Sequence, residues 1–117
     1  MDVPTLLMAG VAGFFGYQMI RGFVGKVAPA KAKELVEGGA KLVDVRTPSE
    51  HRSGHIKGSL NLPVQDLARR MAEIGEKDKP VVVYCASGMR SASAASMLKR
   101  AGYTQVYDLG SIARWPS

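Results

Sequence analysis

The chain has 117 residues, enough for one folded domain, and its hydrophobic and charged fractions of 46% and 22% are typical of a globular protein and exclude a disordered one. Its single cysteine excludes an intrachain disulfide and a metal site built from several cysteines, so we expect no metal and no cofactor. The net charge of +6 is neither gathered in one run nor interleaved with aromatic residues, and we expect no nucleic acid partner.

The first predicted element is an apolar segment. Residues 3–20 carry no charge, and a helix over 4–24 would be about 30 Å long, the thickness of the hydrocarbon core of a bilayer. We predict one hydrophobic helix over 1–25 that anchors the chain in a membrane, and a domain over 26–117. A cleaved signal peptide and an amphipathic helix folded onto the domain are the alternatives. Basic residues follow the apolar run closely while only Asp2 precedes it, which places the domain in the cytoplasm.

Residues 26–117 alternate between helical and extended patterns. Helices are predicted over 29–39, 64–75 and 91–102, each ending at glycine, and strands over 41–46, 79–84 and 104–110. The range 47–63 is rich in turn-forming residues and is predicted to be a long ordered loop. Strands that alternate with helices indicate an α/β fold, with a parallel sheet flanked by helices on both faces.

The lone cysteine stands where a strand of β-branched residues ends and a small-residue helix begins. Ligands of open parallel sheets bind beyond the carboxyl ends of the strands, and Cys85 directly follows such an end. The residues from Ala86 to Arg90 then have to form a tight loop, in which Gly88 supplies a positive φ. The amides of this loop and the helix N-terminus behind it favour the thiolate, and Arg90 adds a positive charge. The alternative is a buried, inert cysteine.

The segments "DVRTPSEHRSGHIKGSLNLP" (44–63) and "VVVYCASGMRS" (81–91) together resemble the rhodanese domain family. The resemblance runs from about Val27 to Trp115, and it implies a parallel-sheet α/β fold and sulfur transfer through a persulfide on Cys85. Tyrosine phosphatases and the phosphatase-like relatives of the family have a loop one residue longer, which makes room for phosphate or arsenate. The shorter loop of this chain has the size that the sulfurtransferases use.

The resemblance also implies which residues form the site. Cys85 is expected to be the catalytic nucleophile, and Arg90 is expected to stabilise the anionic species. The residues expected to bind substrate lie in the loop and at the end of the first strand: Ala86, Ser87, Gly88, Met89, Ser91, Arg46 and Asp44. From the residues alone, Asp44 is interpreted as a buried buttress or as a group that orients Arg46 or Arg90.

The expected partners are a small anionic sulfur donor, such as thiosulfate, and a thiol, a protein cysteine or cyanide as acceptor. The acceptor has to be external, because the chain has no second cysteine to remove the persulfide. The alternatives are a membrane-associated sulfur-relay or docking module with little small-molecule turnover, a small phosphatase or arsenate reductase, and an inert domain. We expect His55 to order its loop through hydrogen bonds and His51 to be a solvated surface residue.

Overall fold

The structure is a computed structural model that describes residues 25–117. The hydrophobic helix predicted over 1–25 therefore lies outside the described residues, apart from Gly25, and its place in a membrane stays a prediction. Within 25–117, none of the helices combines the length and the apolar character that crossing a bilayer requires.

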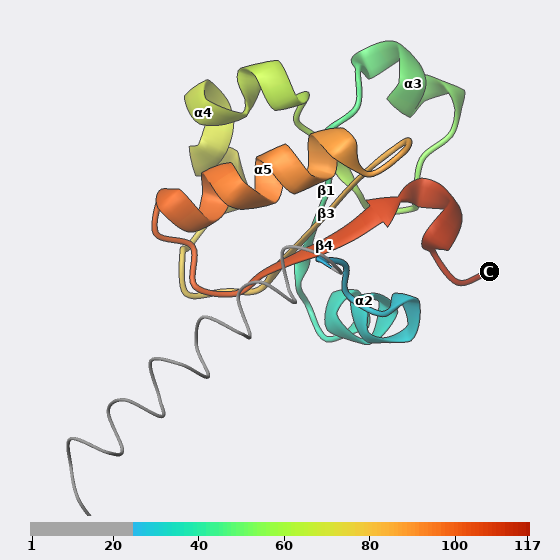
Figure 1. Ribbon diagram of the computed structural model, residues 1–117, viewed down its shortest axis with the longest axis horizontal. Helices are drawn as coiled ribbons and strands as arrows, with labels where there is room; N and C mark the ends of the chain where they lie inside the picture. The colour runs from blue at the N-terminus through green and yellow to red at the C-terminus, as the bar shows by residue number, and fades with distance from the viewer. Residues whose placement is uncertain (1–24) are drawn as a thin grey trace, which may run out of the picture.

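A parallel sheet lies at the centre of the described residues (Figure 1). Its strands lie side by side in the order β2-β1-β3-β4, and every pairing is parallel. In chain order they are β1 (Lys41–Asp44), β2 (Leu60–Asn61), β3 (Val81–Cys85) and β4 (Val106–Ser111). β3 is buried along its whole length, as its apolar run predicts. The three predicted strands are confirmed, and β2 is an additional strand inside the predicted loop.

Helices cover both faces of the sheet, as predicted, with α2 on one face and α4 and α5 on the other (Figure 1). The two longest are α2 (Pro29–Glu37) and α5 (Met89–Arg100). The predicted helix over 64–75 is divided into η1 (Val64–Asp66), α4 (Leu67–Arg70) and η2 (Met71–Ile74). A further short turn, η3 (Ile112–Arg114), follows β4. α5 begins earlier than predicted because Gly88, with a φ of 105°, turns the chain directly into the helix.

The range predicted as a loop contains a short helix, α3 (Pro48–Ser53). A capping box begins it: the Glu50 N–H donates to Thr47 Oγ1 at 3.1 Å, and the Thr47 N–H donates to Glu50 Oε1 at 3.0 Å. Pro48 occupies the first turn, where its missing N–H costs nothing. The box fixes the Glu50 side chain, which accepts a hydrogen bond from Arg90 in the first turn of α5. Figure 1 shows α3 near the turn from β3 into α5.

Side chains alternate between the two faces of β3. Val81, Val83 and Cys85 belong to the apolar cluster beneath α5, whereas Val82 and Tyr84 belong to the cluster beneath α2. Consecutive residues at the carboxyl end of this strand, Tyr84 and Cys85, therefore serve opposite faces of the sheet.

Candidate active site

The sulfur of Cys85 accepts hydrogen bonds from the loop that follows it. The Gly88 N–H donates to Sγ at 2.9 Å and the Ser91 N–H at 3.3 Å. Cys85 itself is fully buried, and its side chain also packs in the cluster beneath α5. The amide donors that the sequence predicts do converge on the sulfur.

Opposing effects act on the pKa of Cys85. Burial raises this pKa because it disfavours the charged thiolate, while hydrogen bonds from the Ser91 side chain and N–H, and from the Gly88 and Ser87 N–H groups, lower it. The hydrogen bonds prevail, and the pKa of Cys85 lies below its usual value. The thiolate, which is the nucleophilic form of cysteine, is therefore favoured.

The first turn of α5 supplies further donors at the same place. The N–H groups of a first helical turn have no acceptor within the helix and point out of its end. That of Ser91 reaches the sulfur, and helix geometry places those of Met89 and Arg90 at the same end of α5. On the outside of the loop, Ala86 and Ser87 are exposed, and the Met89 side chain is 81% exposed. Of the predicted loop residues, the structure brings Ser87, Gly88 and Ser91 to the sulfur, and the roles of Ala86 and Met89 in substrate binding stay predictions.

Arg90 is held by a partner that the sequence patterns do not predict. Its Nη1 and Nη2 atoms donate to Glu50 Oε1 at 2.7 Å and Oε2 at 3.0 Å, and both side chains are 34% exposed. The Arg90 hydrogen bonds are the largest cause that lowers the pKa of Glu50, to about 2. The same bonds raise the pKa of Arg90, and the charge of Cys85 adds to that effect. Arg90 is therefore close enough to attract the thiolate.

We expect Glu50→Gln to reduce the acid sensitivity of the fold. A carboxyl group with a pKa lowered from 4.5 to about 2 stabilises the folded state above about pH 4.5, and this contribution is lost as the pH falls through about 2. The unfolding free energy of the wild type should therefore fall more steeply than that of Glu50→Gln over this interval, measured by denaturant unfolding at a series of pH values. Glu34→Gln, at an exposed position of α2, is the control. Parallel curves for wild type and Glu50→Gln would contradict the expectation.

Asp44 and Arg46 form a buried ion pair. Asp44 Oδ1 accepts from the Arg46 N–H and Nε at 2.9 Å each, and Oδ2 accepts from Arg46 Nη2 at 2.7 Å. The Tyr84 hydroxyl donates to the same carboxylate at 3.2 Å. Burial raises the pKa of Asp44, but the hydrogen bonds from Arg46 and His51 outweigh it, so that this pKa is lowered.

The Asp44 carboxylate lies on the face of the sheet away from the sulfur, although the charge of Arg46 still acts on Arg90. Asp44 lies opposite Tyr84 in the β1–β3 pairing and bonds its hydroxyl, so it shares the sheet face of Tyr84 rather than that of Cys85. The geometry therefore favours the interpretation of Asp44 as a buried buttress, and Asp44 also orients Arg46. The role in substrate binding that the resemblance implies for both residues stays a prediction.

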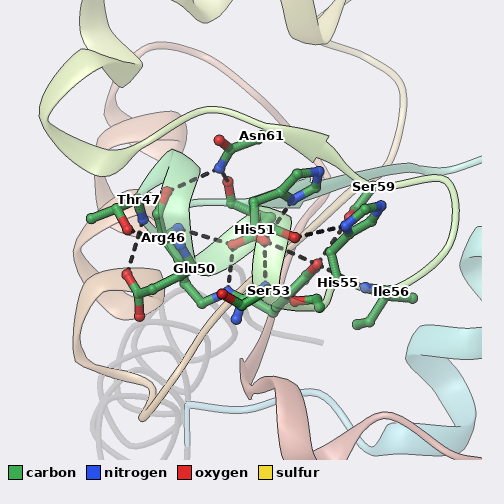
Figure 2. A network of polar contacts seen from close by, with 12 residues as sticks. Arg46, Thr47, Glu50, His51, Ser53, His55, Ile56, Ser59 and Asn61 are labelled. Carbon is green, nitrogen blue, oxygen red and sulfur yellow. Dashed lines mark hydrogen bonds and ion pairs between the residues drawn. The ribbon is translucent and has the colours of Figure 1, made fainter.

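Polar contacts tie the segment after β1 to the sheet (Figure 2). His51 Nδ1 donates to Asp44 at 2.8 Å, and its ring stacks on that of His55 with 3.7 Å between centroids. His55 Nδ1 donates to the His51 carbonyl at 2.8 Å, which confirms the ordering role expected for His55. The expectation of a solvated His51 is wrong: its side chain is 18% exposed, because the ring fits between the Asp44 carboxylate and the His55 ring.

The comparisons with known proteins agree with this fold. Residues 28–117 match the model of the rhodanese-like domain. The chain is 44% identical over 77 residues to the uncharacterized protein YqhL of Bacillus subtilis, a match that covers 65% of this chain and 60% of that protein. It is 38% identical over 93 residues to the thiosulfate sulfurtransferase GlpE of Pseudomonas aeruginosa, with 79% and 84% covered. The human single-domain sulfurtransferase superposes with a TM-score of 0.67 at 28% identity, with 77% and 93% covered.

These matches establish the class to which the fold and the cysteine loop point. The chain belongs to the rhodanese-like domain family. It is a rhodanese-like enzyme, related to several proteins that carry the name thiosulfate sulfurtransferase.

Proposed function

We propose that the chain is a sulfurtransferase that takes sulfane sulfur from a small anionic donor, such as thiosulfate, and passes it to a thiol or to cyanide through a persulfide on Cys85. The observation that carries the proposal is the convergence of the Gly88 and Ser91 N–H groups on the sulfur, which lowers the pKa of Cys85. The relatives named thiosulfate sulfurtransferase support the same activity.

In the first half-reaction, the Cys85 thiolate attacks the outer sulfur of thiosulfate. A bond forms between Sγ and that sulfur, the bond between the two sulfurs of thiosulfate breaks, and its electron pair leaves with sulfite. The terminal sulfur of the persulfide carries the negative charge that the thiolate carried before. The N–H groups at the start of α5 and the charge of Arg90 stabilise this anion.

In the second half-reaction, a nucleophile attacks the terminal sulfur of the persulfide. Cyanide leaves as thiocyanate, a thiolate leaves as a new persulfide, and in both cases the electron pair of the broken bond returns to Cys85 as thiolate. No second cysteine of this chain can act as the acceptor. The reaction therefore alternates between two forms of the protein and needs a separate acceptor molecule.

The size of the loop favours sulfur over phosphate as the transferred group. Four residues separate Cys85 from Arg90, and two of the loop's N–H donors already reach the cysteine sulfur at hydrogen-bond distance. A ring this tight around Sγ suits one additional atom better than a tetrahedral oxyanion. This geometry argues against the phosphatase and arsenate reductase alternatives.

The test is the intact mass of the full chain after incubation with thiosulfate. We expect a gain of one sulfur atom, which cyanide then removes with release of thiocyanate. A reduced, folded chain that gains no mass would overturn the proposal. A stable mass gain with negligible turnover on cyanide or small thiols would instead support the relay alternative, in which a protein cysteine is the acceptor.

We further propose, from the sequence, that the uncharged run over 3–20 anchors the chain in a membrane with the rhodanese-like domain in the cytoplasm. The length of the run and the basic residues that follow it support this placement. Membrane fractions washed with high salt and with carbonate should retain the full chain, and protease added outside intact cells should leave the domain uncut. Recovery of the chain in the soluble fraction would contradict the anchor.

A further inference from the structure

Lys26 reaches the reactive loop from a distant part of the chain. Its Nζ donates to the Gly88 carbonyl oxygen at 3.1 Å, although 62 positions separate the two residues, and it forms an ion pair with Asp108 Oδ2 at 2.7 Å. Lys26 lies before the residues that match the family model, which begin at 28.

The residues around Lys26 hold its side chain in place. Val27 donates its N–H to the Asp108 carbonyl at 2.8 Å, which holds the backbone next to Lys26 alongside β4. The Asp108 carboxylate is 7% exposed, and its Oδ1 accepts the Gly110 N–H at 2.9 Å. The Lys26 stem lies against two glycines: a Cβ at Gly110 would lie 3.1 Å from Cδ, and one at Gly88 would lie 3.5 Å from Cε and Nζ. The ion pair with Asp108 and the packing against the two glycines thus hold the Lys26 ammonium group at the Gly88 carbonyl.

The Gly88 carbonyl has more donors than lone pairs. The Ala92 N–H donates to it at 3.1 Å as the first bond of α5, and Lys26 Nζ and Ser91 Oγ each donate to it at 3.1 Å as well. A carbonyl oxygen offers two lone pairs, and a serine hydroxyl has one hydrogen. When Ala92 and Lys26 fill both lone pairs, the Ser91 hydrogen is free to turn to the Cys85 sulfur. The Ser91 side chain is the largest of the contributions that lower the pKa of Cys85.

We propose that Lys26 is a positioning residue of the reactive loop, which occupies the Gly88 carbonyl and thereby releases the Ser91 hydroxyl to donate to the Cys85 sulfur. The inference rests on the proposed function only in calling the loop reactive. Lys26 also fixes the plane of the Gly88–Met89 peptide, and with it the direction of the Met89 N–H at the helix N-terminus. It touches neither the sulfur nor a substrate, and it acts through Ser91.

The test compares thiolate formation in the full chain and in Lys26→Met. The ultraviolet absorbance of the thiolate, measured against pH and corrected with Cys85→Ser, reports on Cys85 alone because the chain has one cysteine. We expect the pH midpoint of thiolate formation to rise by about one pH unit in Lys26→Met, which corresponds to the energy of one hydrogen bond to a charged group. Persulfide formation from thiosulfate at neutral pH should slow several-fold. Lys31→Met, at an exposed position of α2, is the charge-matched control and should leave both quantities unchanged.

Repeating the Lys26 substitution in a Ser91→Ala variant distinguishes the positioning role of Lys26 from a general loss of structure. In Ser91→Ala the hydroxyl is absent, so adding Lys26→Met should shift the midpoint much less than it does in the wild type. If Lys26→Met leaves Asp108 unpaired and fails to fold, Lys26→Met with Asp108→Asn removes both charges and is measured instead. A wild-type midpoint in either folded Lys26 variant would overturn the inference. So would an equal shift with and without the Ser91 hydroxyl.

The two proposals fail in different ways. A wild type that gains no sulfur while its thiolate midpoint still depends on Lys26 and Ser91 would overturn the proposed function and support the Lys26 inference. If the wild type transfers sulfur but its thiolate midpoint does not depend on Lys26, the proposed function is supported and the Lys26 inference is overturned.

Discussion

Replacement of Cys85 by serine is expected to reduce sulfur transfer to the background of the uncatalysed reaction, a loss of about three orders of magnitude or more. A serine oxygen stays protonated at neutral pH, and the chain has no other cysteine that could carry the sulfur. The serine hydroxyl can still bond the Gly88 and Ser91 N–H groups that surround the sulfur, so the loop should keep its conformation. The loss would therefore be one of chemistry and not of folding.

Two measurements on the Cys85→Ser protein test this prediction. Thiocyanate formation from thiosulfate and cyanide gives the activity, and denaturant unfolding shows whether the Cys85→Ser protein is folded. We expect the unfolding free energy to stay within about 1 kcal/mol of the wild type, because the substitution changes one atom of similar shape. Sulfur transfer by a folded Cys85→Ser protein would show that a different group of the chain carries the sulfur.

Asp44→Ala is expected to destabilise the fold by about 3–5 kcal/mol, the cost of leaving one partner of a buried ion pair unpaired. The Arg46 guanidinium would lose its two hydrogen bonds to the carboxylate and the Arg46 N–H would lose a third, and the side chain, which is 8% exposed, could not regain its bonds from water. His51 and Tyr84 would lose their shared acceptor as well. Because the net stability of a small domain is about 5–15 kcal/mol, this loss would remove a large share of it.

Denaturant unfolding checks this prediction, with Asp66→Ala as the matched control. Asp66 pairs with Arg69, whose side chain is 71% exposed, so its removal should cost less than about 1 kcal/mol. The pH dependence has a defined sign: the lowered pKa of Asp44 means that its contribution is present above about pH 4 and is lost as the pH falls further. Equal costs for the two alanine variants would show that the Asp44 network contributes no more than a surface pair.

Much of the fold and the position of the reactive cysteine can be predicted from local patterns. The apolar run that ends at Cys85 predicts β3, and the glycine after it predicts the turn into α5, although the helix begins at Met89. These features depend on neighbouring residues, which a sequence displays directly. The resemblance of the two motif segments supplies the family, which the match over 28–117 confirms.

The partners of the charged groups are not predictable in the same way. Glu50 and Arg90 are 40 positions apart, and Lys26 and Gly88 are 62 apart, so each contact depends on how the strands are ordered in the sheet. The Thr47 and Glu50 spacing does carry the signature of a capping box, and it is the signal that could have placed α3 in the predicted loop. Nothing in the local sequence indicates that His51 meets Asp44.

The alternation along β3 has a consequence for how this domain can change. Tyr84 bonds Asp44, the Ile56 N–H and Ser59 on one side of the sheet, while Cys85 meets its amide donors on the other. Two neighbouring residues thus have different roles: Tyr84 stabilises the fold, and Cys85 carries the chemistry. Substitutions around the Cys85 sulfur can therefore change its reactivity while the contacts of Tyr84, which stabilise the fold, stay as they are.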